Sequence, residues 1–452
     1  MKDFLLNSLE NILDKKDILI DKDDKYPFSK DWSSLEPSEP EAVVFPKCRD
    51  QVFEIVNLCN SSSQSFIPSG GRTGLSGGAT SVKNELIISF DKFNKILDFD
   101  ESDNSVLCEP GLITANLQNF ASKNNLFYPV DFSSVGSSQI GGNIATNAGG
   151  IKVVKYGLTS KYVKGLEVSG GSGEYFNFDK RLVKDATGPD LKNLFIGSEG
   201  IFGIFLSCRM KLIKPPPPTK TALMGFSNLD DLTKVQNKTS LFEDIEAIEF
   251  FTNNCIKKVK SFLPDLKNLG FESKYYLIIE YSSKETENEL HKFVLKNSFE
   301  EILIGETSRQ KENIWKNRLL ISESINNFRP LKFDISVPLN NFGLLVKEIE
   351  KFIEENKFFE AILFGHIGDG NLHANFLELD KSHAKRKSRE KVEELIVKLV
   401  NILGGSISAE HGIGFIKREL YLNQDKNNDI ASLQAIKKNY DPKNLLNPYK
   451  LI

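Results

Sequence analysis

The segment from Pro68 to Gly78 reads Pro68-Ser69-Gly70-Gly71-Arg72-Thr73-Gly74-Leu75-Ser76-Gly77-Gly78 and holds five glycines in nine positions. Such spacing lets successive backbone N–H groups turn toward one ligand and cradle a phosphate. The same composition also fits a hairpin or a flexible loop, so this segment alone leaves both interpretations open. The chain contains neither the Gly-Lys-Ser/Thr of a P-loop nor a G-x-G-x-x-G after a strand. P-loop and Rossmann-type nucleotide enzymes are therefore disfavoured.

Two later segments repeat this pattern of small residues. Residues 140–150 read IGGNIATNAGG, and residues 197–204 read GSEGIFGI. A long stretch of small residues indicates that a large group lies against the backbone, and Asn143, Thr146 and Asn147 add directional hydrogen bonds for a polar ligand. Taken alone, the 197–204 segment also fits two tight turns beside a buried strand. Three such segments in one half of the chain favour a shared large ligand over chance.

Four consecutive prolines, Pro215 to Pro218, separate two parts of different composition. A proline run favours an extended, stiff connector, so we expect a domain boundary there. Before it, strands such as 41–45 alternate with helices such as 50–61 and with glycine-rich turns. After it, Lys/Glu-rich helices alternate with strands such as 275–281. The last part, from Asp429, predicts a short helix followed by a tail rich in Pro and Asn.

The composition excludes several classes of function. The 452 residues carry 58 Lys and Arg against 61 Asp and Glu, so there is no basic footprint for nucleic acid. The five cysteines form no Cys-x-x-Cys, which argues against an iron–sulfur or zinc-ribbon site and for reduced thiols. No apolar run approaches the roughly 20 residues of a transmembrane helix. The acidic N-terminus has no Arg before Arg49 and resembles no targeting segment, so we expect a cytoplasmic protein.

Three of the five histidines lie in two short motifs, Gly365-His366-Ile367-Gly368-Asp369-Gly370-Asn371-Leu372-His373 and Ala409-Glu410-His411-Gly412-Ile413-Gly414. The stretches 361–367 and 371–377 read as strands, and Asp369-Gly370 is a strong two-residue hairpin turn. A turn centred there pairs His366 directly with His373 and puts Asn375 on the same face. Two imidazoles on one face suit one cation, to which Glu410 would add an oxygen ligand. The alternative is a hairpin with two ordinary hydrogen-bonded histidines.

Two cations upstream of the hairpin are candidates for holding a substrate carboxylate. They are Arg318, in the segment Trp315-Lys316-Asn317-Arg318, and Lys332, in the segment 332–338. An Arg fork binds a carboxylate through two parallel hydrogen bonds, and a Lys binds it as a point charge. By themselves these residues are more typical of solvated charges on helix surfaces, and only the neighbouring motifs make them candidates.

With these motifs in order from Pro37 to Pro448, the chain resembles the vanillyl-alcohol oxidase / p-cresol methylhydroxylase (PCMH) superfamily of flavoproteins. It is most similar to the branch with FAD-linked D-lactate dehydrogenases, D-2-hydroxyglutarate dehydrogenase and the FAD subunit of glycolate oxidase. The resemblance implies an α+β fold with a two-subdomain, PCMH-type FAD-binding domain and a cap domain built on an antiparallel sheet. We expect a helical lead over 1–36, the FAD domain over 37–218, the cap over 219–430, and a segment 431–452 that returns to the FAD domain.

The resemblance also assigns roles to individual residues. It implies noncovalent FAD, because no His or Cys lies in the loop where some members attach flavin. His411 matches the general base of the branch. The FAD contacts would be Gly70, Gly71, Arg72, Thr73, Gly74, Pro129, Gly141, Gly142, Asn143, Thr146, Asn147, Gly149, Gly157, Glu199, Ile204 and Asn447. The ligands of a divalent metal, usually zinc, would be His366, His373 and Glu410, and the substrate contacts would be Arg318, Ser322, Lys332 and Asn375.

Two positions depart from the pattern of the branch. Arg72 stands where relatives more often have Gly or Asn, and Tyr449 replaces the Gly of the usual Asn-Pro-Gly-Lys tail.

The activity implied is FAD-dependent oxidation of a D-2-hydroxy acid, with D-lactate or glycolate as the first expectation. The alternatives are D-2-hydroxyglutarate and a non-redox FAD enzyme such as alkyl-dihydroxyacetone-phosphate synthase, although no two histidines here are neighbours as in that class. A non-catalytic flavin-binding subunit is a third option, which the intact His and Glu residues disfavour. The electron acceptor would be a quinone, cytochrome, electron-transfer flavoprotein or partner subunit, through which the protein could be peripheral to the membrane. The sequence leaves the oligomeric state open, with a homodimer as one option.

Overall fold

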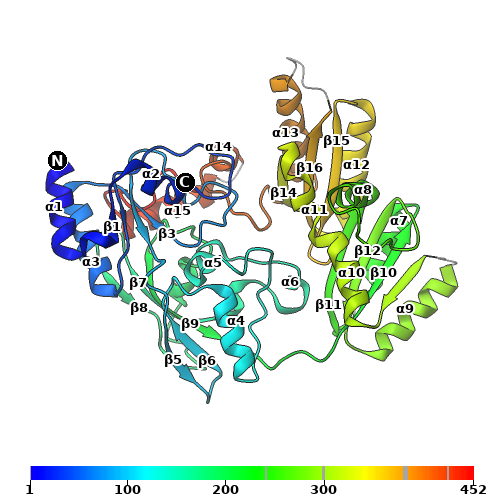
Figure 1. The fold of residues 1–452 in the computed structure, drawn as a ribbon, viewed down its shortest axis with the longest axis horizontal. Coiled ribbons are helices and arrows are strands. Elements are labelled where there is room, and N and C mark those ends of the chain that lie inside the picture. Colours follow the sequence, from blue (N-terminus) through cyan, green and yellow to red (C-terminus); the bar gives the residue numbers. More distant parts are fainter. Residues whose placement is uncertain (1, 240–241, 298–300, 380–384, 425–426) are drawn as a thin grey trace. The chain divides into compact units, whose positions relative to one another are not determined.

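The computed structural model describes residues 2–239, 242–297, 301–379, 385–424 and 427–452. The chain forms two compact units. Unit 1 comprises Met1–Gly149, Leu158–Pro215 and Glu410–Ile452, and unit 2 comprises Gly150–Gly157 and Pro216–Ala409. Unit 1 therefore contains both chain ends, blue and red in Figure 1. This division differs from the expected domains at three places, because it ends unit 2 at Ala409, gives Gly150–Gly157 to unit 2, and leaves no separate N-terminal lead.

Unit 1 contains two sheets. The first has the strand order β1-β2-β4-β3, with β2, β4 and β3 parallel, and the second is antiparallel with the order β5-β6-β9-β7-β8. Its strands are β1 (Ile18–Leu19), β2 (Val43–Val44), β3 (Phe66–Ser69), β4 (Leu86–Ser89), β5 (Ile96–Asp100), β6 (Ser105–Cys108), β7 (Val163–Ser169), β8 (Tyr175–Asn177) and β9 (Ile204–Lys211). Its helices are α1 (Lys2–Ile12), α2 (Lys22–Lys25), α3 (Arg49–Ser62), α4 (Thr114–Lys123), α5 (Ile140–Thr146), α14 (Arg418–Leu422) and α15 (Asn427–Tyr440).

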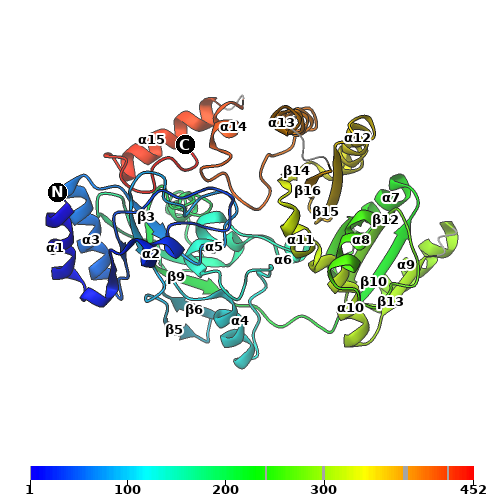
Figure 2. The same ribbon diagram turned by 45° about the horizontal axis from the view of Figure 1, so that its top comes forward.

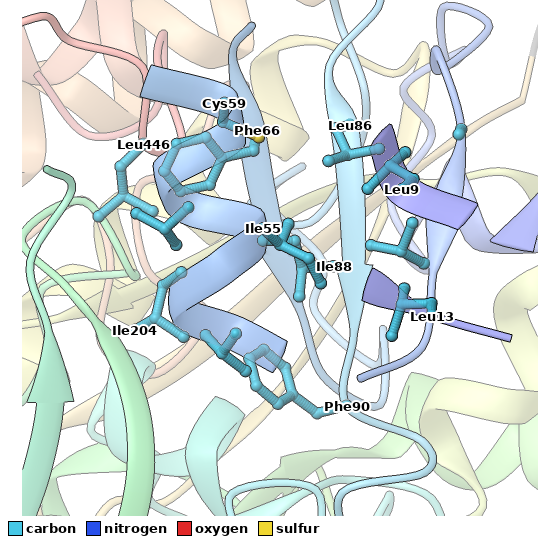
Figure 3. Close-up of a cluster of buried hydrophobic side chains, with 14 of the residues drawn as sticks. Leu9, Leu13, Ile55, Cys59, Phe66, Leu86, Ile88, Phe90, Ile204 and Leu446 are labelled. Atoms are coloured by element: carbon cyan, nitrogen blue, oxygen red, sulfur yellow. The ribbon is translucent and has the colours of Figure 1, made fainter. Parts of the chain in front are cut away.

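One hydrophobic core ties α1 and α3 to both sheets of unit 1 (Figure 3). The predicted helix over 50–61 is confirmed as α3, and its apolar residues at i, i+3, i+4 and i+7, Val52, Ile55, Val56 and Cys59, are buried. They pack with Phe66 and Ile88 of the parallel sheet and with Ile204 of β9. Ile204, one of the FAD contacts that the resemblance implies, thus contributes to this core.

The C-terminal tail is built into the parallel sheet of unit 1. The Phe66 N–H donates to Leu445 O (2.8 Å), and the Asn447 N–H donates to Phe66 O (2.7 Å), so the tail lies beside β3 as an extra short strand. The buried Asp441 accepts from the N–H groups of Leu445 and Leu446, which fixes the turn between α15 and the tail. The sequence prediction of a helix followed by a tail from Asp429 is confirmed by α15.

Unit 2 is built on a seven-stranded sheet in which every neighbouring pair is antiparallel, with the order β13-β10-β12-β11-β15-β16-β14. Figures 1 and 2 show it in green to orange with its helices around it. The strands are β10 (Lys220–Phe226), β11 (Ile245–Thr252), β12 (Tyr275–Tyr281), β13 (Ile302–Gly305), β14 (Leu331–Ser336), β15 (Phe359–Gly365) and β16 (Asn371–Glu378). The helices are α6 (Val153–Tyr156), α7 (Leu229–Thr239), α8 (Asn253–Phe262), α9 (Lys284–Asn297), α10 (Ser308–Leu319), α11 (Ile321–Ile325), α12 (Phe342–Glu355) and α13 (Lys385–Ile402).

Helices cover both faces of this sheet. Residues of α8, α10 and α11 form one core with the face that carries Phe251, Ile362 and Phe364. On the opposite face, Phe342 of α12 packs edge-on against Phe250, with ring centroids 5.4 Å apart. The antiparallel sheet expected for the cap domain is therefore confirmed, and the face under α10 holds the polar residues described below.

The register of the β15–β16 hairpin differs from the prediction. His373 lies directly opposite Phe364 rather than His366, and the strands are joined by a five-residue loop, His366–Gly370, instead of a two-residue turn. The loop closes on itself because Asn371 N–H donates to His366 O (3.2 Å) and Gly370, at φ 82°, takes the left-handed conformation. A shift of two residues preserves the face, because side chains alternate with period two along a strand.

Candidate functional site

A cavity of unit 1, of about 240 Å³, is lined by three segments that the sequence singled out. Its walls are the 70–74 loop, helix α5 with the residues that follow it, and the Glu410-His411 pair. Among the predicted FAD contacts it brings together Gly70, Gly71, Arg72, Thr73, Gly74, Gly142, Asn143, Thr146, Gly149 and Glu199. The structure thus gathers residues from positions 70 to 411 around one space.

Glycines shape this cavity in two different ways. A Cβ on Gly71 would lie 2.1 Å from Ser137 O, so Gly71 is required for close packing of two loops. A Cβ on Gly142 would meet no protein atom within 4 Å and would point into open space. A wall of Gly, Ala, Ser and Thr therefore leaves backbone accessible to a large ligand, and these residues fit the flavin nucleotide that the sequence predicts.

Arg72 has a structural role within the glycine-rich loop. Its backbone takes the left-handed conformation at φ 57°, which Gly and Asn adopt more readily than Arg. Its guanidinium donates to Gly70 O (2.8 Å), pairs with Asp91 (3.0 Å) and lies over the ring of Phe28. The Arg72 side chain thus stabilises the glycine-rich loop by joining it to Asp91 and Phe28.

The other six predicted FAD contacts do not line this cavity. Gly141 lines a smaller adjoining cavity of about 60 Å³, together with Ile204. Pro129 is buried, and Asn147 ends α5 in the left-handed conformation while its Oδ1 accepts from Ser160 N–H (2.9 Å). Gly157 ends α6 and belongs to unit 2.

Asn447 connects the tail to the cavity wall, because its Nδ2 donates to Glu199 O (2.9 Å). The sequence analysis missed several lining residues, namely Asp31, Ser76, Phe132, Ser133 and Gln139. Of these, only Ser76 lay within a segment that it quoted.

The loop that carries Glu410 and His411 is clamped inside unit 1. The Glu199 carboxylate accepts hydrogen bonds from Ile413 N–H (2.7 Å) and Gly414 N–H (2.6 Å). Burial raises the pKa of Glu199, and these two backbone donors oppose the rise. Ser76 O accepts from the next turn, at Phe415 N–H (2.9 Å).

The glycines of this loop allow those close approaches. Gly414 has φ 55°, and a Cβ there would lie 2.1 Å from Ser76 O. A Cβ on Gly412, at φ 72°, would lie 2.8 Å from a carboxylate oxygen of Glu199. The Gly-Ile-Gly sequence after His411 therefore fixes the loop that presents the histidine to the cavity.

In unit 2 the two hairpin histidines converge as predicted, although by a different register. Their ring centroids are 5.3 Å apart with the rings nearly perpendicular, and one ring nitrogen of each lies within 4.8 Å of the other. His366 Nδ1 is 2.5 Å from Glu249 Oε1, and His373 Nδ1 is 3.6 Å from Asp334 Oδ1. A carboxylate behind each imidazole is typical of histidines that bind a metal through the other nitrogen.

Glu249 is the residue of this cluster that the sequence analysis missed, and Asp334 lies in the segment 332–338 but was given no role there. Glu249 lies on β11, far along the chain from the hairpin, and is fully buried. Two acids, Glu246 and Glu249, within the otherwise largely apolar strand β11 are the signal that could have identified it, because an acid is almost never buried without a partner.

The four predicted substrate contacts are arranged around this cluster in different ways. Arg318, on α10, is buried and its Nη2 lies 2.7 Å from Glu249 Oε2. Lys332 pairs directly with the buried Asn375 across β14 and β16, next to the Asp334–His373 pair. The Lys332 side chain is exposed, yet partial desolvation of its ammonium lowers its pKa. Ser322 is exposed on α11.

Comparison with known proteins decides the family. Residues 215–451 match the model of the FAD linked oxidases, C-terminal domain, and residues 40–179 match an FAD binding domain. The chain belongs to the FAD-linked oxidase family. A protein of Stutzerimonas stutzeri named D-2-hydroxyglutarate dehydrogenase is 38% identical over 99% of this chain and 98% of its own length. A protein of Xanthomonas citri pv. viticola with the same name is 34% identical over 94% of this chain and 92% of its own length.

Solved structures support the fold of this FAD-linked oxidase. A p-cresol methylhydroxylase with substrate bound matches with a TM-score of 0.79 and 17% identity, over 99% of this chain and 96% of its own. An alkyldihydroxyacetonephosphate synthase matches with a TM-score of 0.74 and 16% identity, over 99% of this chain and 84% of its own. The predicted α+β fold of the PCMH type is thereby confirmed.

Family membership confirms the predicted FAD cofactor and the predicted reaction class, FAD-linked dehydrogenation of a CH–OH group in a 2-hydroxy acid. The divalent metal, the electron acceptor and a homodimer stay predictions. No helix among the described residues is long and apolar enough to cross a membrane. The cytoplasmic location also stays a prediction, and the name of a relative from Arabidopsis thaliana carries the word mitochondrial.

Proposed function

We propose that this FAD-linked oxidase is a D-2-hydroxyglutarate dehydrogenase that forms the 2-oxo acid. The observation that carries the proposal is the 38% identity, over nearly the whole of both chains, to a relative of that name. The first expectation from the sequence, D-lactate or glycolate, is not confirmed, and its alternative is better supported. A relative from Schizosaccharomyces pombe named as a putative D-lactate dehydrogenase is 29% identical.

The charge on the site residues also favours a dicarboxylate. Arg318 and Lys332 supply two cations from different elements of unit 2, α10 and β14. A dicarboxylate offers a charge to each, whereas lactate and glycolate offer one. We assign Arg318, Ser322, Lys332 and Asn375 to substrate binding.

We assign the metal to His366, His373 and Glu410. The two imidazole nitrogens converge in unit 2, and Glu410 directly follows Ala409, whose N–H donates to Asp334 Oδ2 (3.2 Å). Two neutral nitrogens and one carboxylate oxygen are a common donor set for zinc in catalytic sites. When bound, the metal supplies a Lewis acid for the substrate hydroxyl and FAD supplies the hydride acceptor.

We assign His411 as the general base. It lines the cavity of unit 1 on a loop that Glu199 and Ser76 hold in place. A histidine ring nitrogen suits proton transfer near neutral pH, and it would take the hydroxyl proton of the substrate. The fixed loop keeps the imidazole oriented, so the proton acceptor needs no rearrangement during the reaction.

The electron acceptor that reoxidises the flavin is assigned only by class. The sequence predicts a quinone, cytochrome, electron-transfer flavoprotein or partner subunit. A relative from Saccharomyces cerevisiae, 30% identical over 94% of this chain, is named D-2-hydroxyglutarate–pyruvate transhydrogenase. A small 2-oxo acid such as pyruvate therefore belongs among the acceptors to be assayed.

The proposal is tested by anaerobic absorbance titration of the metal-replete holoenzyme with D-2-hydroxyglutarate, L-2-hydroxyglutarate, D-lactate and glycolate. We expect D-2-hydroxyglutarate to bleach the oxidised-flavin band at the lowest concentration. Bleaching by D-lactate or glycolate at lower concentrations would instead support the sequence-based expectation that one of these acids is the substrate.

A further inference from the structure

The buried carboxylate of Glu249 contacts two functional side chains at once. Its Oε1 lies 2.5 Å from His366 Nδ1, and its Oε2 lies 2.7 Å from Arg318 Nη2. All three side chains are more than nine-tenths buried, and Glu249 is fully inaccessible. One carboxylate on β11 therefore joins a residue of the β15–β16 loop to a residue of α10.

We propose that Glu249 is a positioning residue that couples the metal-binding His366 to the substrate-binding Arg318. The inference rests on the proposed function, because both partners take their roles from it. It goes beyond that function in assigning a residue that touches neither the metal nor the substrate.

The contact with Glu249 determines which nitrogen His366 can offer. An Nδ1–H that donates to a carboxylate leaves Nε2 as the lone-pair nitrogen, and it makes that nitrogen a stronger ligand. His373 has a weaker support, because its Nδ1 lies 3.6 Å from Asp334, beyond an ordinary hydrogen bond. Glu249 therefore fixes the orientation of the His366 ring.

The same carboxylate holds Arg318 against the sheet face that α10 covers. The guanidinium lies 4.7 Å from the ring centre of Phe364, so it is fixed from two sides. Within the described chain, Arg318 Nε is buried and has no hydrogen-bond partner. Arg318 Nη2 is thus paired with Glu249, and the adjacent Nε–H is the donor left for a further acceptor.

A neighbouring acid on the same strand provides a matched control. Glu246 is equally buried, but it accepts from Tyr156 Oη (2.6 Å) and lies 3.9 Å from Lys152, and neither is assigned to metal or substrate. Glu249→Gln and Glu246→Gln each remove one buried negative charge from β11. Any general effect of removing a buried negative charge from this strand therefore appears in both variants.

The test is Zn²⁺ binding to metal-free, FAD-loaded protein, measured by competition with a chelating dye, together with KM for D-2-hydroxyglutarate. In Glu249→Gln, the amide can accept from His366 only by turning its NH₂ group toward the guanidinium. We expect the Zn²⁺ affinity to fall by about 10- to 100-fold, as for other outer-shell carboxylates, and KM to rise. Glu246→Gln is expected to keep the Zn²⁺ affinity within about twofold.

The outcomes separate this inference from the proposed function. Wild-type Zn²⁺ affinity in a folded Glu249→Gln protein, or equal losses in both variants, would overturn the coupling role. Should Glu249→Gln fail to fold, Glu249→Asp is tested in its place. Its shorter carboxylate reaches only one of the two partners, so either the Zn²⁺ affinity must fall or KM must rise. A wild-type protein without affinity for Zn²⁺ would overturn the inference, while flavin bleaching by D-2-hydroxyglutarate would still support the proposed function.

Discussion

The two units of this FAD-linked oxidase build their sites by opposite means. The cavity of unit 1 is lined mainly by small residues, and its contacts depend on backbone groups and on glycines such as Gly71 and Gly142. The cluster of unit 2 is made of buried charges, in which Glu249 bridges Arg318 and His366. A backbone-built site is sensitive to added volume, whereas a charge-built site is sensitive to conservative changes of charge. The predictions below test this contrast, from the largest expected effect to the smallest.

His411 is the point at which a reactive side chain enters the backbone-built cavity. We expect His411→Ala to slow anaerobic flavin reduction by D-2-hydroxyglutarate about 10²- to 10⁴-fold, the usual contribution of a general base. The FAD content should stay at the wild-type level, because the loop is held by Glu199 and Ser76 rather than by the imidazole. Stopped-flow absorbance measures both. Flavin reduction at the wild-type rate would remove His411 from its role.

Substitution of Lys332 tests whether the substrate is a dicarboxylate or a monocarboxylate. We expect Lys332→Met to lower kcat/KM for D-2-hydroxyglutarate about 10- to 100-fold, the cost of losing one charged hydrogen bond. Activity with D-lactate should change much less. Lys316→Met is the matched control, because Lys316 is an exposed lysine of α10 that pairs only with Glu312 among the contacts described. Equal losses with both acids would place Lys332 at the carboxylate that all 2-hydroxy acids share.

Gly142 tests the backbone-built cavity. A methyl group at Gly142 meets no protein atom within 4 Å but enters the cavity, so Gly142→Ala should fold normally and bind FAD about tenfold more weakly, as expected for overpacking. Gly136→Ala is the control, since its Cβ also meets nothing and it does not line the cavity. Fluorescence titration of apoprotein with FAD measures both. Wild-type affinity in Gly142→Ala would mean that the flavin lies elsewhere.

Lys450 contributes the smallest effect, through the stability of unit 1. Its buried ammonium donates to Thr80 O (2.7 Å), and burial lowers its pKa to about 8. Because the unfolded chain then binds this proton more tightly, the free energy of unfolding should rise with pH above 8, by about 1 kcal/mol between pH 8 and pH 9. Urea unfolding at the two pH values measures the rise. The rise should be present in the wild type and absent from Lys450→Met. An equal pH dependence of the free energy of unfolding in both proteins would refute the prediction.

The sequence was sufficient for elements whose local signals agree with their packing. α3 shows its apolar stripe, and β12 occupies the predicted stretch 275–281, an apolar run that only Glu280 interrupts and that is buried on both faces. The cavity of unit 1 was also largely predictable, since runs of glycine are visible in one dimension. The hairpin turn was wrong, because Asp369-Gly370 is a strong turn signal whereas the loop is closed by His366 O and by packing of Gly370 against Val337 O.

Long-range pairing of charges could not be read from the sequence. Glu249 is 117 positions from His366, and it is one of 61 acidic residues. Arg318 looked like a surface charge or a free clamp, and only the fold shows that it is buried against Glu249. The expectation of D-lactate or glycolate is not confirmed, because the motif residues indicate a 2-hydroxy acid without showing the charges that would face the rest of the substrate.

Removal of the metal tests the central claim most directly, namely that the histidine cluster of unit 2 binds a metal that oxidation of D-2-hydroxyglutarate requires. Purified holoenzyme is treated with a chelator, its flavin spectrum is recorded, and D-2-hydroxyglutarate is added without oxygen before and after Zn²⁺ is restored. We predict that the chelated enzyme keeps its FAD, that the substrate no longer bleaches it, and that Zn²⁺ restores bleaching. Bleaching of the chelated enzyme at the untreated rate would contradict the account.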